Sequence, residues 1–403
     1  MGAAGSRDLR KFPQETLCDH NGSINCMAAS DDESLLVTGS EDKTARVWSV
    51  GEDDTECLGV IRGHTSYITC VTVHDTFVIT GSADSTLRKW DIITCDCLFT
   101  YHGHNSRVTR VLCTGEYVFS TSQDTTAKAW YIDEDELEEH DDTSVCIRTF
   151  QGHTGGIYCL AIIPGDDQIN EVKGLGDVII TGSMDCTARS WCFTSGTCLK
   201  KFEGHTSCVS CLATDNAGRL LYTGSADRTL RSWDLATGIC FRVFAGHQHH
   251  VVCLVVLKQL LYSGDGGGVV KGWEVGADDH LPRNLHQHKT LTVEALNTFT
   301  GHNNTVNCIK FHKGIVYTGC SDNLTRAFDA TSKQLLAVYV GHKIGVNCLM
   351  MCGTKLFSGS TDTTIMVWDL AKRSTELDDQ DSSDEDDDSD DNNANDNEDN
   401  SAK

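Results

Sequence analysis

Short apolar segments bounded by turn residues recur along the chain, as in Val178–Thr181 and Leu220–Thr223. Segments of this length, rich in β-branched residues and closed by Gly, Ser and Asp, predict short β-strands joined by tight turns. No apolar run reaches 18 residues, so the pattern predicts no membrane-spanning helix. The length of 403 residues, with 39% hydrophobic content and three prolines, is ample for a large folded core.

The strand pattern is organised into eight copies of one unit. Its best copies read L-x-T-G-S-x-D-x-T-x-R-x-W, and seven end in Trp48, Trp90, Trp130, Trp191, Trp233, Trp273 and Trp368, while an eighth ends in Phe328. A Gly-His pair precedes most of the aromatics, and Asp19-His20 stands in its place in the first copy. From aromatic to aromatic the intervals are 42, 40, 61, 42, 40, 55 and 40 residues. A repeat of this period predicts an array of similar supersecondary units.

These residues resemble the WD40-repeat family, including the propellers of F-box WD proteins. The resemblance implies an all-β fold: an eight-bladed WD40 β-propeller with four antiparallel strands per blade. We expect residues 1–8 to be a flexible N-terminus, 9–370 to form the propeller, and 371–403 to be a disordered acidic tail.

Each repeat carries a His, a Ser or Thr, an Asp and the aromatic at constant offsets, which the family uses as a structural tetrad. A carboxylate in the turn can accept from an imidazole, and a hydroxyl can link imidazole to indole, so buried polar groups satisfy one another. A hydrolase triad is the alternative, but an active site is needed once and this set recurs. We therefore expect tetrads, not catalysis, at His64, Thr80, Asp84, Trp90; His104, Ser120, Asp124, Trp130; His153, Thr181, Asp185, Trp191; His205, Thr223, Asp227, Trp233; and His342, Ser358, Asp362, Trp368.

Two copies depart from this pattern, and we expect both blades to be weaker. In the sixth, Gly267 stands where Asp belongs and Val269 where Thr belongs, inside a glycine run that predicts a slack turn and lacks phosphate-loop spacing. In the seventh, Leu324 replaces Thr and Phe328 replaces Trp.

The N-terminal segment should close the ring. No strand-like run follows Trp368, whereas Leu9 to Cys18 lies where other copies place their outer strand. Because a propeller blade that lacks its outer strand leaves an open edge, we expect this segment to complete the last blade.

The twenty cysteines follow the repeat, which argues against disulfides and zinc. One set stands six residues after the repeat histidine, and another opens the outer strand. Both are places where free cysteine serves as a small apolar side chain in a reducing compartment. His205 with Cys208 and Cys211, and the cluster around His247, could hold zinc, but the repeat accounts for most of these residues. We expect no metal and no cofactor.

The net charge of the chain limits the kinds of partner that it is expected to bind. The formal charge is −25, and residues 374–403 hold fourteen acidic residues against Lys403, so the tail supplies −13 and the rest −12. Binding to nucleic acid through phosphates is disfavoured, and basic partners are favoured. The tail is either solubilising or a docking segment, and Ser382 and Ser383, each with an acid three residues on, resemble acidophilic kinase sites.

The first six residues fit the N-myristoylation pattern M-G-x-x-x-[ST], which makes Gly2 a candidate for acylation. One acyl chain gives only marginal anchoring. We expect a cytoplasmic protein, with the nucleus as alternative, bound peripherally to membranes only where Gly2 is acylated, and a monomeric propeller.

The resemblance also implies where partners bind. Top-face residues in the family fall three and five positions after the repeat histidine and just before the turn aspartate. Carried over by register, the larger side chains are Tyr67, Arg107, Tyr158, Met184 and His250, and the polar ones are Asn25, Thr69, Thr109, Gln123, Ser210, Asn307 and Asn347. Tyr and Arg are frequent anchors of protein interfaces, although any one of these could be a plain exposed residue.

From these features we expect a non-enzymatic scaffold or adaptor that binds partner proteins or peptides on the propeller faces. The alternative is a substrate-recognition subunit of a ubiquitin ligase. The arginines with which F-box WD receptors bind phosphopeptides, often just before the turn aspartate, are absent from that position in all eight copies. The partner's identity does not follow from the fold alone.

Overall fold

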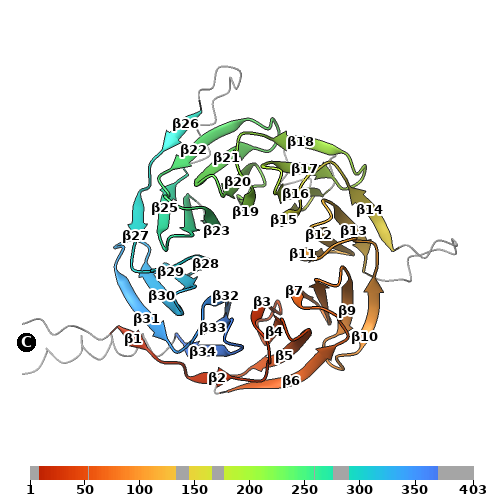
Figure 1. Ribbon diagram of the computed structural model, residues 1–403, viewed down its shortest axis with the longest axis vertical. Coiled ribbons are helices and arrows are strands. Elements are labelled where there is room, and N and C mark those ends of the chain that lie inside the picture. The colour runs from red at the N-terminus through yellow and green to blue at the C-terminus, as the bar shows by residue number, and fades with distance from the viewer. Residues whose placement is uncertain are drawn as a thin grey trace, which may run out of the picture.

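A computed structural model describes residues 9–52, 54–132, 145–165, 177–257, 259–275 and 290–370. Its strands form eight antiparallel sheets arranged radially around a central opening (Figure 1). The predicted eight-bladed propeller is confirmed. No helix occurs among the described residues, and so none of them forms a helix able to cross a membrane.

The first four blades follow the chain in order, each running outward from the central opening. Blade 1 contains β3 (Ile24–Ala29), β4 (Leu35–Ser40), β5 (Thr44–Val50) and β6 (Thr55–Arg62); blade 2 contains β7 (Ile68–His74), β8 (Phe77–Ser82), β9 (Leu87–Asp91) and β10 (Cys97–Tyr101); blade 3 contains β11 (Val108–Thr114), β12 (Tyr117–Ser122), β13 (Ala127–Tyr131) and β14 (Cys146–Phe150); blade 4 contains β15 (Ile157–Ile163), β16 (Val178–Ser183), β17 (Ala188–Cys192) and β18 (Cys198–Phe202).

The last four blades repeat the plan, and two of them carry an additional strand. Blade 5 contains β19 (Val209–Thr214), β20 (Leu220–Ser225), β21 (Thr229–Asp234), β22 (Cys240–Ala245) and the added β26 (Leu291–Val293); blade 6 contains β23 (Val251–Leu257), β24 (Leu260–Asp265), β25 (Val270–Glu274) and β27 (Asn297–Phe299); blade 7 contains β28 (Val306–His312), β29 (Ile315–Cys320), β30 (Leu324–Asp329), β31 (Leu335–Val340) and the added β1 (Arg10–Lys11); blade 8 contains β32 (Val346–Cys352), β33 (Lys355–Ser360), β34 (Ile365–Asp369) and β2 (Glu15–Leu17).

The N-terminal segment closes the ring, as predicted, but only part of it lies in the last blade. Strand β2 pairs antiparallel with β34, with Thr16 opposite Met366. The residues before it form β1, which pairs parallel with β31 of blade 7. One segment therefore joins blades 7 and 8. The pair β26 and β27 does the same for blades 5 and 6, since β26 lies parallel on β22 and β27 completes blade 6.

The hydrophobic core lies between neighbouring blades. In the cluster between blades 1 and 2, Val37 and Val47 of blade 1 pack with Trp90 of blade 2, and all three are buried. The cluster between blades 8 and 1 is built in the same way around Trp48. Because each aromatic residue packs against the preceding blade, every blade depends on its neighbour, as expected for a repeat protein.

Candidate partner-binding site

A chain of hydrogen bonds runs through the predicted tetrad of blade 5. The Trp233 indole N–H donates to Thr223 Oγ1 at 2.8 Å, and Thr223 Oγ1 lies 2.8 Å from His205 Nε2. His205 Nδ1 lies 2.7 Å from Asp227 Oδ2. An indole can only donate, so the hydroxyl proton is directed to Nε2 and the Nδ1–H to the carboxylate.

The same arrangement occurs in blades 1, 2, 3, 4 and 8. The residues are His20, Thr38, Asp42, Trp48; His64, Thr80, Asp84, Trp90; His104, Ser120, Asp124, Trp130; His153, Thr181, Asp185, Trp191; and His342, Ser358, Asp362, Trp368. Each hydroxyl is buried and shared between an indole and an imidazole. It is not presented to a substrate, so the geometry is that of a packing network and not of a nucleophile with its base.

The electrostatics of the tetrads of blades 1 and 4 favour neutral histidine and ionised aspartate. Burial alone would raise the pKa of Asp42, but hydrogen bonds from Thr44, the Asn21 N–H and His20 outweigh it and hold that pKa at about 2. Burial lowers the pKa of His20 below the usual range, although the Asp42 carboxylate opposes the change. The same directions hold for Asp185 and His153.

The sixth blade contradicts the expectation of a weakened tetrad. Asp265, two residues before the expected position, places Oδ2 2.8 Å from His247 Nδ1, and its Oδ1 accepts from the N–H groups of Gly267 and Val269 at 3.0 and 2.9 Å. Ser263 joins His247 to Trp273 as in other blades. The turn is therefore fully hydrogen-bonded and not slack.

The glycine run of this blade lies beneath two histidine rings. A Cβ at Gly266 would lie 2.2 Å from the His250 ring, and a Cβ at Gly267 would lie 2.2 Å from the His249 ring. The two rings cover the turn where other repeats carry side chains. Both histidines are exposed, so a larger residue at either position would displace a ring at the surface and not the core.

In the seventh blade a guanidinium lies beside the tetrad that lacks the indole. Arg326 is buried, and its Nη1 lies 2.8 Å from Asp322 Oδ2 and in contact with His302 Nδ1. His302 keeps the contacts of the other repeat histidines, since its Nδ1 lies 3.0 Å from Asp322 Oδ2 and its Nε2 lies 2.7 Å from Thr318 Oγ1. The Asp322 carboxylate therefore has both the imidazole and the guanidinium as partners.

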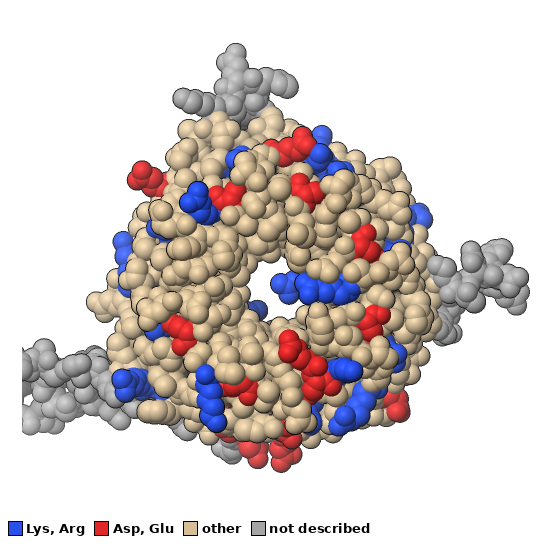
Figure 2. Space-filling model, viewed as in Figure 1, with Lys and Arg blue, Asp and Glu red and all other residues tan. Residues whose placement is uncertain are grey.

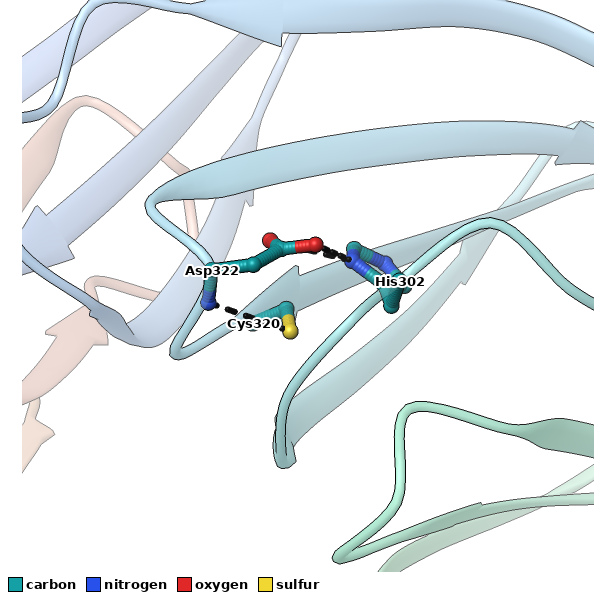
Figure 3. A group of neighbouring side chains, drawn as sticks. All are labelled: His302, Cys320 and Asp322. Atoms are coloured by element: carbon teal, nitrogen blue, oxygen red, sulfur yellow. Dashed lines mark hydrogen bonds and ion pairs between the residues drawn. The ribbon is translucent and has the colours of Figure 1, made fainter.

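His302, Cys320 and Asp322 are the one group among the described residues with metal-ligand spacing (Figure 3). Cys320 occupies the place of the repeat serine, donating to the Asn304 carbonyl at 3.0 Å and accepting from the Asp322 N–H at 3.3 Å. Burial raises the pKa of its thiol to about 12. A protonated thiol and the Arg326 cation make this a poor metal site, because bound metals require deprotonated ligands.

The predicted top-face residues converge in part on one cavity of about 650 Å³ at the central opening. We define the top face as the side formed by the loops after the repeat histidines and the turns of the repeat aspartates. The cavity is lined by the predicted Asn25, Tyr67, Thr69, Arg107, Thr109, Tyr158, Met184 and Ser210, and by Glu41, Val108, Arg110, Cys208 and Val252, which the top-face prediction did not include. Of the predicted residues, Gln123, His250, Asn307 and Asn347 lie outside this lining.

Several of these polar residues hold blades together. Five positions after six of the eight repeat histidines, a side chain donates to a carbonyl of the next blade: Asn25 to Ile68, Thr69 to Val108, Thr109 to Ile157, Ser210 to Val251, Asn307 to Val346, and Asn347 to Ile24. Where Tyr158 and Val252 occupy this position, the following Cys159 and Cys253 thiols donate instead, at 3.8 and 3.4 Å. The donors of these residues are thus engaged within the ring, which leaves Tyr67, Arg107, Tyr158 and Met184 as the better contact candidates.

Those four side chains form a half-open surface. The Arg107 Nη1 donates to the Tyr67 hydroxyl at 3.3 Å, and the Tyr158 hydroxyl lies 3.4 Å from Met184 Sδ. Met184 is 54% exposed. Figure 2 shows basic side chains reaching into the central opening from the side where β11 lies. Arg110 could have been found from the sequence, since it alone replaces cysteine six residues after a repeat histidine.

All twenty cysteines are free thiols, as their repeat register predicts. Burial raises the pKa of Cys70 to about 11 and that of Cys211 to about 12, so both remain protonated near neutral pH. The three candidate modification positions, Gly2, Ser382 and Ser383, lie outside the described residues.

Comparisons with known proteins agree with this architecture. The family model "WD domain, G-beta repeat" matches residues 11–49, 55–91, 95–131, 144–192, 196–234, 293–329 and 333–369. The unmatched stretch between 235 and 292 contains the altered turn of blade 6. The computationally designed Ika8 protein, known from a crystal structure, is 27% identical with a TM-score of 0.72, over 90% of this chain and 100% of its own.

Curated relatives match over about half of this chain. Human WD repeat-containing protein 86 is 43% identical over 219 residues, which is 54% of each chain. WD repeat-containing protein pop1 of Schizosaccharomyces pombe is 28% identical, and Mitochondrial division protein 1 of Mycosarcoma maydis is 24% identical, over 48% and 46% of this chain. The chain spans about half the length of the first relative and less than a quarter of the other two. Family model, repeated tetrads and eight radial blades together place this chain in the WD40-repeat family.

Proposed function

We propose that this protein is a non-enzymatic interaction scaffold whose top-face cavity binds a segment of a partner protein. The observation that supports it most is the convergence of Tyr67, Arg107, Tyr158 and Met184, from blades 2, 3 and 4, on one cavity. Tyrosine side chains have few rotamers and lose little entropy on binding, and Tyr and Arg are typical anchors of interfaces. Members of this family are generally protein-interaction scaffolds.

The proposal treats the propeller as cytoplasmic or nuclear, with Gly2 as a candidate lipid site. Neither the described residues nor the relatives' names favour the ubiquitin-ligase alternative over a general scaffold. If Gly2 is acylated, a Gly2→Ala variant should lose its membrane-associated fraction on cell fractionation. An unchanged fraction would rule out acylation as an anchor.

The test of the scaffold function compares two triple variants in affinity purification with quantitative mass spectrometry. Tyr67→Ala, Arg107→Ala and Tyr158→Ala together should release the partners that bind the cavity. Leu58→Ala, Ile93→Ala and Leu98→Ala remove exposed side chains of blades 1 and 2 outside the cavity and serve as the matched control. Partners should be lost with the first variant alone, while both variants keep a normal melting temperature. Equal recovery with both would contradict the proposal.

A further inference from the structure

The third repeat departs from its siblings at two cavity positions, and both changes introduce arginine. Three residues after the repeat histidine the other copies carry Ser23, Tyr67, Gly156, Cys208, His250, Thr305 and Gly345, whereas the third carries Arg107. Six residues after it the other seven carry cysteine, whereas the third carries Arg110. Places where one repeat breaks a shared local rule are candidates for function.

The packing of the ring does not require these two arginines. Arg110 is exposed, and Arg107 is half-buried with one hydrogen bond to the Tyr67 hydroxyl. Among the described residues, neither guanidinium forms an ion pair. The repeat arginines at other positions differ, since Arg88, Arg189 and Arg231 lie over the tryptophans of their own blades.

Arg110 acts at the centre of the ring. Burial is the main influence on the thiols of Cys26, Cys70, Cys159 and Cys211 and raises their pKa values, while the positive charge of Arg110 opposes it in all four. These thiols belong to blades 1, 2, 4 and 5. A charge that acts on four blades besides its own lies near the axis of the ring, and Arg110 lines the top-face cavity.

The cavity is therefore locally basic in a strongly acidic protein. Its lining contains two cations and one carboxylate, Glu41, whereas the whole chain carries a formal charge of −25. The basic cavity lining is opposite in charge to the chain as a whole, whose negative charge favours basic partners. Guanidinium groups bind carboxylate and phosphate oxygens with paired N–H donors, so the lining fits an oxyanion.

We propose that the top-face cavity binds a partner segment through an acidic side chain, which Arg107 and Arg110 hold by charge-assisted hydrogen bonds. Tyr67 supports Arg107, and Tyr158 and Met184 pack against the neighbouring residues of the segment. The proposal rests on the scaffold function and specifies the chemistry of its ligand. The occupant is an acidic segment of another protein.

The experiment measures binding of the full-length protein to four 12-residue peptide libraries that differ only in a fixed central residue. The centre is Glu, phosphoserine, Gln or Lys, and the flanking positions are randomised without acidic residues. We expect the Glu and phosphoserine libraries to bind roughly tenfold or more tightly than the Gln library, and the Lys library to bind worst. The ratio of phosphoserine to Glu distinguishes a phosphoryl from a carboxylate preference.

Arg107→Gln with Arg110→Gln should abolish the preference for an acidic centre. The matched control, Arg62→Gln with Lys313→Gln, removes the same two charges from exposed positions outside the cavity and should preserve it. An acidic preference that survives the Arg107 and Arg110 substitutions would overturn the proposal. So would equal binding of the Glu and Gln libraries by the unmodified protein.

Two further outcomes separate the related claims. If Tyr67→Ala with Tyr158→Ala leaves binding of every library unchanged, the cavity is not the peptide site and the scaffold function at this cavity fails as well. The chain's own acidic tail is the competing source of carboxylates. If the tail does not occupy the cavity, replacing the acidic residues 384–388 by Asn and Gln in the full-length chain should leave library affinity within about twofold. A tail that does occupy it would compete strongly, because a tethered competitor acts at a high effective concentration. A tenfold increase would show that the tail occupies the cavity and would overturn the choice of a partner protein as the occupant.

Discussion

A single carboxylate, Asp265, carries the tetrad of blade 6, although it lies two residues before the expected position. Asp265→Ala would leave His247 Nδ1 and two turn N–H groups without their acceptor. We expect a cost of about 1–3 kcal/mol and a lower Tm by calorimetry. Glu116→Ala, on an exposed turn, is the control and should change little. An Asp265→Ala variant with the Tm of the unmodified protein would contradict this assignment.

Arg326 has a structural role that its repeat siblings lack. It is buried and contacts both His302 and Asp322, so Arg326→Ala would remove one charged partner from a carboxylate that keeps His302 and two backbone N–H groups. We expect a loss of about 1.5–3 kcal/mol. Arg231→Ala is the matched control and should cost about 1 kcal/mol or less, because Arg231 lies over Trp233 and does not pair with Asp227. Similar Tm values for the two variants would contradict the bridging role.

At this scale the sequence identifies residues that recur at fixed spacing and misses those that replace them. The tetrad role could be predicted where the spacing recurs, as at His205, Thr223, Asp227 and Trp233. The role of Asp265 is hidden because it stands two residues before the repeat position, and spacing alone does not reveal that its carboxylate still contacts His247. The contacts of Arg326 with His302 and Asp322 are hidden because other repeats carry arginine at the same position without them.

The closing element depends on Glu15 of strand β2. Its Oε1 lies 3.4 Å from Nζ of Lys355, a buried residue of blade 8, and its Oε2 accepts from the Thr55 N–H of blade 1 at 2.9 Å. Glu15→Ala should therefore weaken both sides of the closure and cost about 3 kcal/mol or more, because it leaves a buried ammonium unpaired.

Deleting residues 1–18 should lower the Tm of the whole ring further, since blade 8 then loses its outer strand and exposes β34. Deleting residues 1–8 alone removes none of these contacts and serves as the control. Thermal unfolding by circular dichroism checks both. An unchanged Tm after the longer deletion would show that β2 does not close the ring.

Strands inside the repeats were predictable from the sequence, whereas strands outside the repeats were predicted less well. The segment from Leu9 to Cys18 was predicted to complete the last blade, because it lies where other copies place their outer strand. The structure divides it between β1 and β2. The parallel pairing of β1 and β26 is not readable from the sequence, since a two- or three-residue strand on a neighbouring edge has no periodicity of its own.

For the molecule as a whole, seven complete tetrads and the altered one of blade 7 make stability a collective property of the ring. The number of blades was predictable because one aromatic ends each unit, and the cavity residues were partly predictable from their register. The sequence did not show which of these residues are free for a partner and which hold blades together. Asn25 and Asn347, for example, donate to carbonyls of neighbouring blades, and those carbonyls come close only when the ring is closed. Loss of one tetrad should therefore be felt in the neighbouring blades.

The stability of the ring should decline in two pH ranges as the solution is acidified. Burial places the pKa of His20 and His153 below the unfolded value of about 6.5, so their stabilising effect is complete above that pH and is lost as the pH falls through the folded values. Hydrogen bonds overcome burial at Asp42 and Asp185 and hold their pKa at about 2, so the contribution of these carboxylates is complete above about pH 4 and is lost as the pH falls toward 2. The Tm should be level above pH 7, decline below 6.5 and fall most steeply below 4.

Asp42→Asn should lower the Tm at pH 7. The difference in Tm between this variant and the unmodified protein should narrow below pH 4, because Asp42 of the unmodified protein is then protonated. A difference that stays constant across this range would show that the charge of Asp42 contributes nothing and that the tetrad acts through shape alone.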